Sequence, residues 1–239
     1  MKEGKRIADD TMSRSESTGR AAWDRHWESL RTSRTLFGRI ASIVRTQLLS
    51  RAVRHYAARF FTERGIFVEA GCGTAQSSGR LGELRRRLVA LDFSPFALNE
   101  SRHVPVFAGS VQGDIRRLPF RDGSVAGIWN LGVMEHFSEK NGLAILVEFR
   151  RVLESGGVVV LFWPPEFGLS RLILAPVERI LSWRRSPPFA FFPDEVNRLR
   201  SREHARRTLT DAGFNAAAVD FSFRDLFIHL VVVGRKPKA

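Results

Sequence analysis

Residues 67–75, which read FVEAGCGTA, constrain the fold more than any other stretch of this 239-residue chain. A short apolar run ends at an acidic residue, and two glycines follow with one residue between them. This order predicts a strand, a tight turn and the start of a helix. Glycine lets the backbone pass close to a ligand where a Cβ atom would clash, and the free N–H groups at the start of the helix then point at that ligand.

A second apolar run, residues 88–91, ends at Asp92, about one βαβ unit after the first acid, Glu69. An acid at the tip of the second strand suits a ribose, because both hydroxyl groups of the sugar can donate to one carboxylate. The two runs together predict a site for a cofactor that contains a nucleoside.

Composition fits one α/β domain with additions, because 44% of the residues are hydrophobic and no apolar run reaches the roughly 18 residues that span a bilayer. An apolar signal-peptide core is also absent at the N-terminus. Cys72 is the single cysteine, which fits a reducing cytoplasm, and we interpret it as a small spacer between the two glycines. No set of His, Cys, Asp and Glu residues has the spacing of a metal site.

The formal charge of +13 is unevenly distributed. Residues 21–65 carry nine Lys and Arg against three Asp and Glu, whereas residues 66–163 carry eleven against ten. The positive excess therefore lies outside the segment that contains the glycines. Such a charge attracts nucleic acid, anionic lipid or phosphorylated metabolites. The alternative is that these residues, mostly arginines, only form a solvent-exposed surface with no binding role.

Four motifs between residues 64 and 163 resemble those of class I S-adenosylmethionine-dependent methyltransferases, in the family's order. The glycine stretch resembles E/D-x-G-x-G-x, with Ala75 at the third glycine. Residues 113–120, GDIRRLPF, resemble G-D-x-x-x-L-P-F, and residues 122–130 resemble the D-x-S-F-D motif, with Ala126 for its last Asp. Residues 149–157 resemble F-x-R-V-L-K-P-G-G, with Glu and Ser for Lys and Pro. The resemblance implies S-adenosyl-L-methionine as cofactor and methyl transfer as reaction.

The resemblance also assigns the cofactor to residues at the ends of the expected strands, namely Glu69, Gly71, Cys72, Gly73, Asp92, Phe93, Asp114, Ile115, Asn130 and Leu131. The residues of the glycine stretch should border the methionine and the ribose, and Asp92 should accept from the ribose hydroxyls. Asp114 should accept from the adenine amino group, with Phe93 and Ile115 against the ring. Asn130 and Leu131 should close the methionine end.

Glu135 and His136 follow the expected fourth strand and are the candidates for catalysis. A histidine has the pKa range of a general base, and E-H-F resembles the sequence found here in several relatives, including enzymes that modify lipids. The alternative is that His136 caps the next helix and that Glu135 is a contact on the cofactor side. The N/D-P-P-Y motif of amino-directed members is absent after this strand, which argues against methylation of adenine N6 or glutamine.

We expect a doubly wound, Rossmann-like α/β fold, with a seven-stranded, mostly parallel sheet and an antiparallel last strand. The expected organisation is a flexible N-terminus at 1–20, a helical cap at 21–63, and a methyltransferase domain at 64–239 with a lid insertion at 164–195. Strands are expected at 66–70, 88–92, 105–108, 127–131, 158–163, 214–221 and 226–233, and helices at 75–87, 94–101, 139–153 and 202–211. Trp23 and Trp27, four residues apart, predict a packing contact of a short helix.

The leading functional hypothesis is methyl transfer to a small-molecule or lipid-like acceptor, because the expected lid is rich in apolar and aromatic residues. Its arginines would suit an acidic group on that acceptor. RNA methylation is the second hypothesis, since the charge suits nucleic acid, and a non-catalytic cofactor-binding scaffold is the third. A nicotinamide dehydrogenase is a weaker alternative, because Gln76 stands where G-x-G-x-x-G has its last glycine. We expect a cytoplasmic location with peripheral membrane contact as an option.

Overall fold

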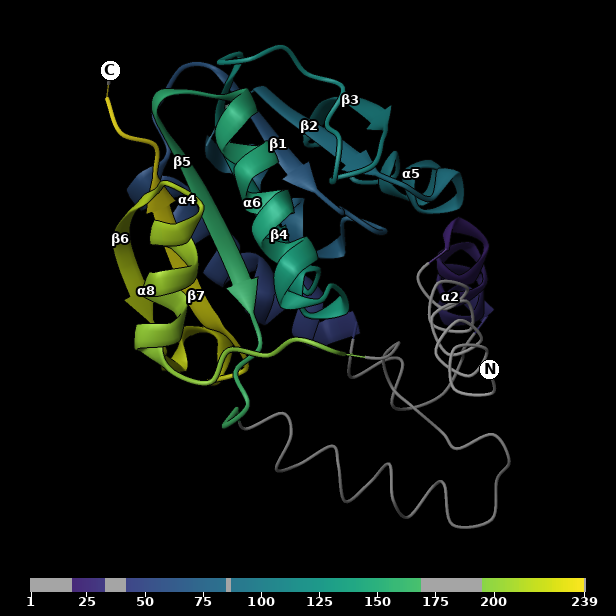
Figure 1. Cartoon of the computed structure of the whole chain (residues 1–239). Coiled ribbons are helices and arrows are strands. Elements are labelled where there is room, and N and C mark those ends of the chain that lie inside the picture. The colour runs from purple at the N-terminus through teal and green to yellow at the C-terminus, as the bar shows by residue number, and fades with distance from the viewer. Residues whose placement is uncertain (1–18, 33–41, 85–86, 169–194, 239) are drawn as a thin grey trace, which may run out of the picture.

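The computed structural model describes residues 19–32, 42–84, 87–168 and 195–238, which fold around one seven-stranded sheet (Figure 1). The strand order is β3-β2-β1-β4-β5-β7-β6. Five strands pair in parallel, and β7 runs antiparallel to both of its neighbours. The strands are β1 (Ile66–Ala70), β2 (Arg87–Asp92), β3 (Phe107–Gln112), β4 (Val125–Leu131), β5 (Leu153–Trp163), β6 (Asn215–Asp220) and β7 (Leu230–Arg235). This topology confirms the expected doubly wound sheet with an antiparallel last strand.

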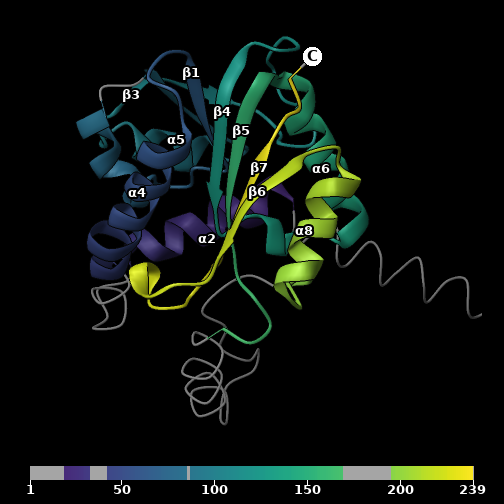
Figure 2. The same ribbon diagram turned by 90° about the vertical axis from the view of Figure 1, so that its left-hand side faces the viewer.

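Helices cover both faces of the sheet (Figure 2). One face carries η1 (Val44–Leu49), α4 (Ser50–Phe60), η2 (Gln76–Leu84) and α5 (Pro95–Ser101), and the other carries α6 (Glu139–Val152) and α8 (Arg202–Asp211). The remaining helix, α2 (Arg20–Thr32), contacts α5 near the edge where the parallel strands end. Two short turns of helix, η3 (Met134–His136) and η4 (Phe223–Asp225), lie in the connections.

Strand β5 contributes side chains to the hydrophobic clusters on both faces of the sheet. Val159 and Leu161 pack in the cluster that includes the apolar face of α6, whereas Val160 and Phe162 pack in the cluster that includes α4. A strand that is buried on both faces needs a continuous apolar run rather than an alternating pattern. Residues 158–163 have such a run, which is why the sequence predicted a central strand there.

Three expected elements differ from the structure in their bounds. The helix expected at 75–87 is the shorter 3-10 helix η2, because its glycines and serines favour an α-helix weakly. The strand expected at 105–108 begins at Phe107 and runs on to Gln112 as a polar edge strand. The last strand begins at Leu230 instead of Leu226, because η4 and a tight turn fill the residues before it.

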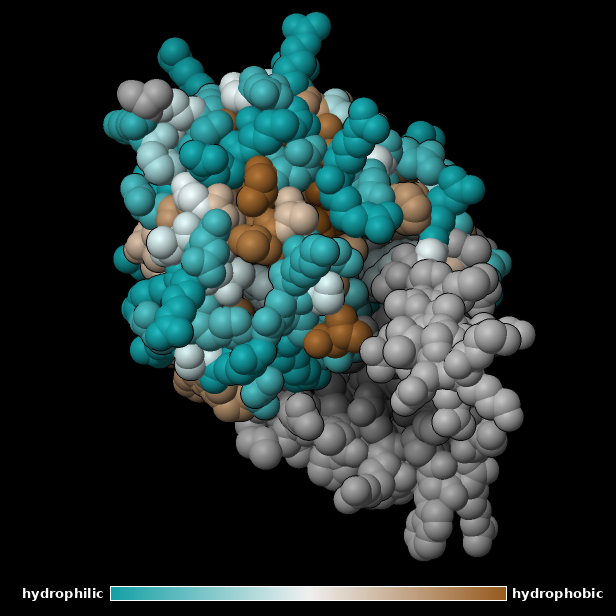
Figure 3. Space-filling view, viewed as in Figure 1, coloured by the Kyte–Doolittle hydropathy of each residue, from teal (hydrophilic) through white to brown (hydrophobic). Residues whose placement is uncertain are grey.

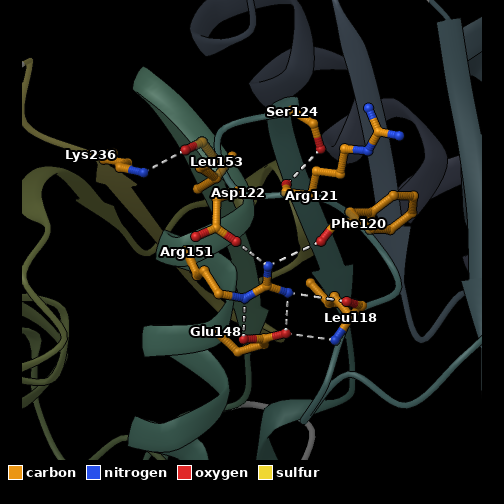
Figure 4. A network of polar contacts seen from close by, with 9 residues as sticks. All are labelled: Leu118, Phe120, Arg121, Asp122, Ser124, Glu148, Arg151, Leu153 and Lys236. Atoms are coloured by element: carbon orange, nitrogen blue, oxygen red, sulfur yellow. Dashed lines mark hydrogen bonds and ion pairs between the residues drawn. The ribbon is translucent and has the colours of Figure 1, made fainter.

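Arg151, in the motif that resembles F-x-R-V-L, joins the end of α6 to the connection before β4 (Figure 4). Its guanidinium donates to both oxygens of Glu148, at 2.7 and 2.8 Å, and to the carboxylate of Asp122. It also donates to the carbonyl oxygens of Leu118 and Phe120, at 3.1 and 3.0 Å. The hydrogen bonds from Arg151, opposed by partial burial, lower the pKa of Glu148. The motif is therefore a structural clamp on the sheet.

Two expectations fall almost entirely outside the described residues, namely the flexible N-terminus at 1–20 and the lid insertion at 164–195. The boundary expected near residue 64 lies in the connection between α4 and β1. Within the described ranges, no helix combines the length and the apolar character that crossing a bilayer requires.

Candidate functional site

The glycine loop after β1 has a backbone that only glycine adopts easily. Gly71 and Gly73 have φ angles of +77° and +51°. A Cβ atom at Gly71 would lie 2.8 Å from Val133, and one at Gly73 would lie 2.5 Å from the ring of Trp27. The N–H groups of Gly71 and Cys72 both donate to the carbonyl of Leu91, at 2.8 and 3.0 Å, which ties the loop to the end of β2.

Asp92 ends β2 and holds the glycine loop through both of its oxygens. Its Oδ2 accepts from the N–H of Gly73 and its Oδ1 accepts from the N–H of Ser94, each at 2.8 Å. Burial raises the pKa of this carboxyl, and the two N–H donors partly offset that rise. A carboxylate has about four acceptor sites, so Asp92 can still accept a hydrogen bond from a sugar diol.

Glu69 and Cys72 are buried on the protein side of the loop. The hydroxyl of Ser78, from η2, donates to Glu69 at 2.7 Å, and burial raises the pKa of Glu69 to about 8. Burial likewise raises the pKa of the Cys72 thiol, which agrees with its interpretation as a spacer and disfavours a nucleophilic thiolate. Glu69 therefore joins β1 to η2 behind the loop.

In the described structure, Asn130 is the residue that most clearly indicates a ligand contact. Its side chain is fully buried, yet neither the oxygen nor the nitrogen of its amide has a hydrogen-bond partner among the described residues. Leaving such a group unpaired costs about 1–3 kcal/mol. Leu131 follows it at the end of β4 and is half-buried. The amide thus fits a ligand group that both donates and accepts.

The residues expected around the adenine ring lie after β2 and β3. Phe93 is 36% exposed, whereas Ile115 is buried. Asp114 accepts from the guanidinium of Arg116 at 2.6 to 3.0 Å. Burial would raise the pKa of Asp114, but the hydrogen bonds from Arg116 outweigh that effect and lower it. Asp114 is thus a charged acceptor at the rim of the site.

Glu135 and His136 are adjacent in η3 but have different partners. The backbone carbonyl of Glu135 accepts from Val196 and Asn197, and its Oε2 has no hydrogen-bond partner among the described residues. Burial raises the pKa of Glu135 to about 8. The ring of His136, in contrast, meets the ring of Trp23 edge to face, with 4.9 Å between their centres.

Helix α2 supplies the part of the site that was hardest to predict from the sequence. Asp24 accepts from the hydroxyl of Ser94, and Trp27 packs on Gly73. The pKa of His26 is lowered to about 4, first by burial and then by the charges of His136 and Arg45, so this imidazole is neutral at pH 7. The spacing of the two tryptophans predicted a packing contact, but nothing in the sequence pointed to Asp24 or His26.

Two side chains of α2 contact the candidate site: Trp27 packs on Gly73, and Trp23 meets His136. A hollow of about 350 Å³ lies elsewhere, between η1 and η2, and none of the expected site residues lines it. In the part of the chain that the structure describes, no group of three or more His, Cys, Asp or Glu residues could hold a metal ion. The glycine loop, Asn130 and His136 therefore define the candidate site.

Comparisons with known proteins find methyltransferases. A family model described as a methyltransferase domain matches residues 68–161. A putative methyltransferase of Encephalitozoon cuniculi is 31% identical over 110 residues, which are 46% of this chain and 50% of that protein. A malonyl-[acyl-carrier protein] O-methyltransferase of Yersinia pestis is 31% identical over 107 residues, 45% of this chain and 39% of the relative. The chain thus spans half or less of the length of these two curated relatives.

Solved structures share the fold over nearly the whole chain. Magnesium protoporphyrin IX methyltransferase from Synechocystis with bound SAH is 16% identical, has a TM-score of 0.65, and covers 95% of this chain and 99% of its own. The same enzyme with bound SAM has a TM-score of 0.61 at 14% identity, over 95% of this chain and 97% of its own.

The described residues fit a cofactor that joins a nucleoside to an amino acid. Asp92 keeps acceptor capacity at the end of β2, where a ribose would lie. The unpaired amide of Asn130 matches the amino and carboxylate groups of a methionine. The two glycines let the loop pass close to its neighbours, because a Cβ atom at either would collide with Val133 or Trp27.

Proposed function

We propose that this chain transfers a methyl group to a small-molecule or lipid-like acceptor. By its residues 68–161, the chain belongs to the class I S-adenosylmethionine-dependent methyltransferases. S-adenosylmethionine is the cofactor of this class. The observation that carries the proposal for the acceptor is the contact between His136 and Trp23 beside the glycine loop. This contact places His136, which can accept a proton, beside the aromatic ring of Trp23 at the edge of the sheet where ligands bind.

The chemistry divides between the cofactor and the chain. S-adenosylmethionine supplies an electrophilic methyl group on a sulfonium that leaves as a neutral thioether. Asp92 and the glycine loop hold the ribose, and Asn130 binds the amino-acid end. His136 takes the proton from the attacking atom of the acceptor, and the neutral His26 places no second positive charge beside it. Trp23 and Trp27 exclude water and align the acceptor.

The aromatic side chains of α2 favour an acceptor with a flat or apolar body. Trp23 and Trp27 stack with 6.1 Å between their ring centres, and His26 meets both rings edge to face. Such rings offer large contact area to an apolar molecule and little to a strongly hydrated one. The relative from Yersinia pestis is named as an O-methyltransferase, which supports an oxygen atom as the acceptor.

The test compares cofactor binding with turnover in two histidine variants. We expect His136→Gln to lower methyl transfer about 100-fold or more, the usual contribution of a general base, while calorimetric affinity for S-adenosylmethionine stays within about twofold. His103→Gln is the matched control, because His103 is exposed and lines the hollow between η1 and η2, which none of the expected site residues lines.

The assay follows a radiolabelled methyl group over panels of small acids, lipids and RNA. Equal losses of affinity and turnover in His136→Gln would make His136 a structural residue. Labelling of RNA alone would replace the proposed acceptor class.

A further inference from the structure

The connection between β6 and β7, residues 221–228, exposes large apolar side chains, and we name it the aromatic loop. Phe223 is 69% exposed, Leu226 52% and Phe227 40%. Phe167, 48% exposed, extends the same surface, because its ring centre lies 5.3 Å from that of Phe221, which lies 5.1 Å from that of Phe227. Single exposed apolar residues are normal, but a contiguous group marks a binding surface.

The backbone holds these side chains outward under strain. Leu226 and Phe227 have φ angles of +55° and +56°, and the left-handed conformation costs a bulky residue about 1–2 kcal/mol. Asp225, which is 1% exposed, fixes the turn by accepting from the backbone N–H of His229 at 2.8 Å. Strain of this kind persists where surrounding contacts enforce it, and it is common at functional surfaces.

Two arginines lie near this surface, one over an exposed ring of the loop and one on α4. The guanidinium of Arg224 lies 5.6 Å from the ring centre of Phe223, and that of Arg59 lies 5.1 Å from the ring centre of Phe60. The pKa of His55 is lowered, first by burial and then by the charges of Arg224 and Arg59, so both arginines lie near this histidine. Asp220 opposes them there with a smaller effect. The surface therefore combines apolar rings with positive charge.

The aromatic loop lies at the same end of the sheet as the candidate site. β7 begins at Leu230, which pairs with Trp163 at the carboxyl end of β5. Figure 2 shows the yellow aromatic loop and the purple α2 at this end, below the tips of the parallel strands. A flat partner that contacts the loop would thus face the edge of the sheet where the site lies.

We propose that the aromatic loop docks the protein onto an anionic lipid surface, where its three exposed apolar side chains enter the interfacial region and Arg59 and Arg224 contact the headgroups. Aromatic rings and arginines together are typical of side chains at a membrane interface. The net charge of +13 favours an anionic surface and disfavours a second copy of the chain as the partner. The inference goes beyond the proposed function, because binding to vesicles requires no methyl transfer.

The experiment is co-sedimentation of the full chain with two kinds of vesicle. One kind is neutral phosphatidylcholine, and the other contains about 30 mol% phosphatidylglycerol, which creates the negative surface that arginines recognise. We expect binding to the anionic vesicles to be at least about tenfold tighter than to the neutral ones, and to weaken as salt screens the headgroups.

Variants separate the apolar from the charged contribution. The double variant Phe223→Ser with Leu226→Asn should bind anionic vesicles at least about tenfold more weakly, and Asn tolerates the left-handed conformation at that position. Arg224→Gln should weaken binding to anionic vesicles only. If the double variant does not fold, Phe223→Ser alone carries the test, because Phe223 is the most exposed of the three.

Val147→Ser is the matched control, because Val147 is 49% exposed on α6. Figure 3 shows hydrophobic side chains over α6 amid a polar surface, on a different face from the aromatic loop. This variant should bind vesicles like the wild type. Equal losses in Val147→Ser and in the double variant would overturn the proposal, since the effect would then be unspecific.

The other possible results of these experiments also test the proposal. Equal binding of neutral and anionic vesicles, or no binding, would overturn the proposal, as would a dimer in sedimentation velocity that the double variant abolishes. Calorimetry with S-adenosylmethionine on the same preparations separates this inference from the proposed function. Cofactor binding and methyl transfer without vesicle binding would contradict only the proposal of a docking surface. Vesicle binding without methyl transfer would contradict only the proposed function.

Discussion

Among single residues, Asp92 is the one whose two oxygens are both committed to backbone N–H groups of the site. In Asp92→Asn, one of these oxygens becomes an amino group that faces an N–H donor. We expect S-adenosylmethionine affinity to fall at least about tenfold and the free energy of unfolding to fall by about 1–3 kcal/mol. Calorimetry and urea denaturation measure the two effects. Asp211→Asn, an exposed change on α8, is the control, and an unchanged affinity in Asp92→Asn would contradict the role of this carboxylate.

Glu69 predicts a pH dependence of stability for the protein without cofactor. Burial raises its pKa in the folded state from 4.5 to about 8, so the folded protein binds an extra proton between these values. The stabilisation is therefore complete below about pH 4.5 and is lost as pH rises through about 8, by up to about 1.4 kcal/mol per pH unit.

Glu69→Gln removes this proton and keeps an oxygen that can accept from Ser78. We expect its free energy of unfolding, from urea titrations at pH 6, 7 and 8, to fall less steeply than that of the wild type. Some slope should remain, because the pKa of Glu135 is raised to about 8 by the same cause. Identical slopes in the two proteins would show that Glu69 is already ionised in the fold.

The contrast between Asp92 and His26 shows what local sequence reveals about a site. The position of Asp92 was predicted because it follows an apolar run and therefore lies at the end of a strand. That end of the sheet is where ligands bind, so a binding role could be proposed from the sequence. His26 lies near enough to His136 to feel its charge only because α2 folds back over the glycine loop. No periodicity within residues 20–32 encodes that contact, since it depends on packing against residues far away in the chain.

At the scale of elements, the placement of α2 over the glycine loop can be tested by a double-mutant cycle. Gly73→Ala should cost about 1–2 kcal/mol from its left-handed backbone alone, and more because the new Cβ would lie 2.5 Å from the ring of Trp27. In the Trp27→Ala background that collision is absent. We therefore expect a coupling of at least about 0.5 kcal/mol in urea denaturation of the four proteins. Additive effects would place α2 away from the loop.

Elements were predicted well where burial dictates their pattern and poorly where it does not. The apolar run of β5 was readable from the sequence, because a strand buried on both faces needs such a run. β3 was misplaced because it is an edge strand, and one face of an edge strand needs no apolar residues. The helix expected at 75–87 is the 3-10 helix η2, and its apolar spacing carries no information on the hydrogen-bond pattern that its glycines favour.

For the whole molecule, the site joins segments that are distant in sequence: α2, the glycine loop, the end of β2 and the turn after β4. A ligand that contacts all of them stabilises the entire fold against unfolding. At a concentration of about 100 times its Kd, S-adenosylmethionine should add about 2.7 kcal/mol to the free energy of unfolding. For a chain of this size, that corresponds to a rise in Tm of about 5–10 °C.

Thermal denaturation followed by circular dichroism checks this expectation, with NADPH at the same concentration as the matched control. NADPH shares the nucleoside but lacks the methionine that Asn130 would bind, so it should leave Tm unchanged. Equal shifts in Tm with both ligands would mean that the site recognises only the nucleoside. The amide of Asn130 would then not bind the methionine. Saturating S-adenosylmethionine without any shift would mean that the ligand binds the unfolded chain equally well, which contradicts a site assembled by folding.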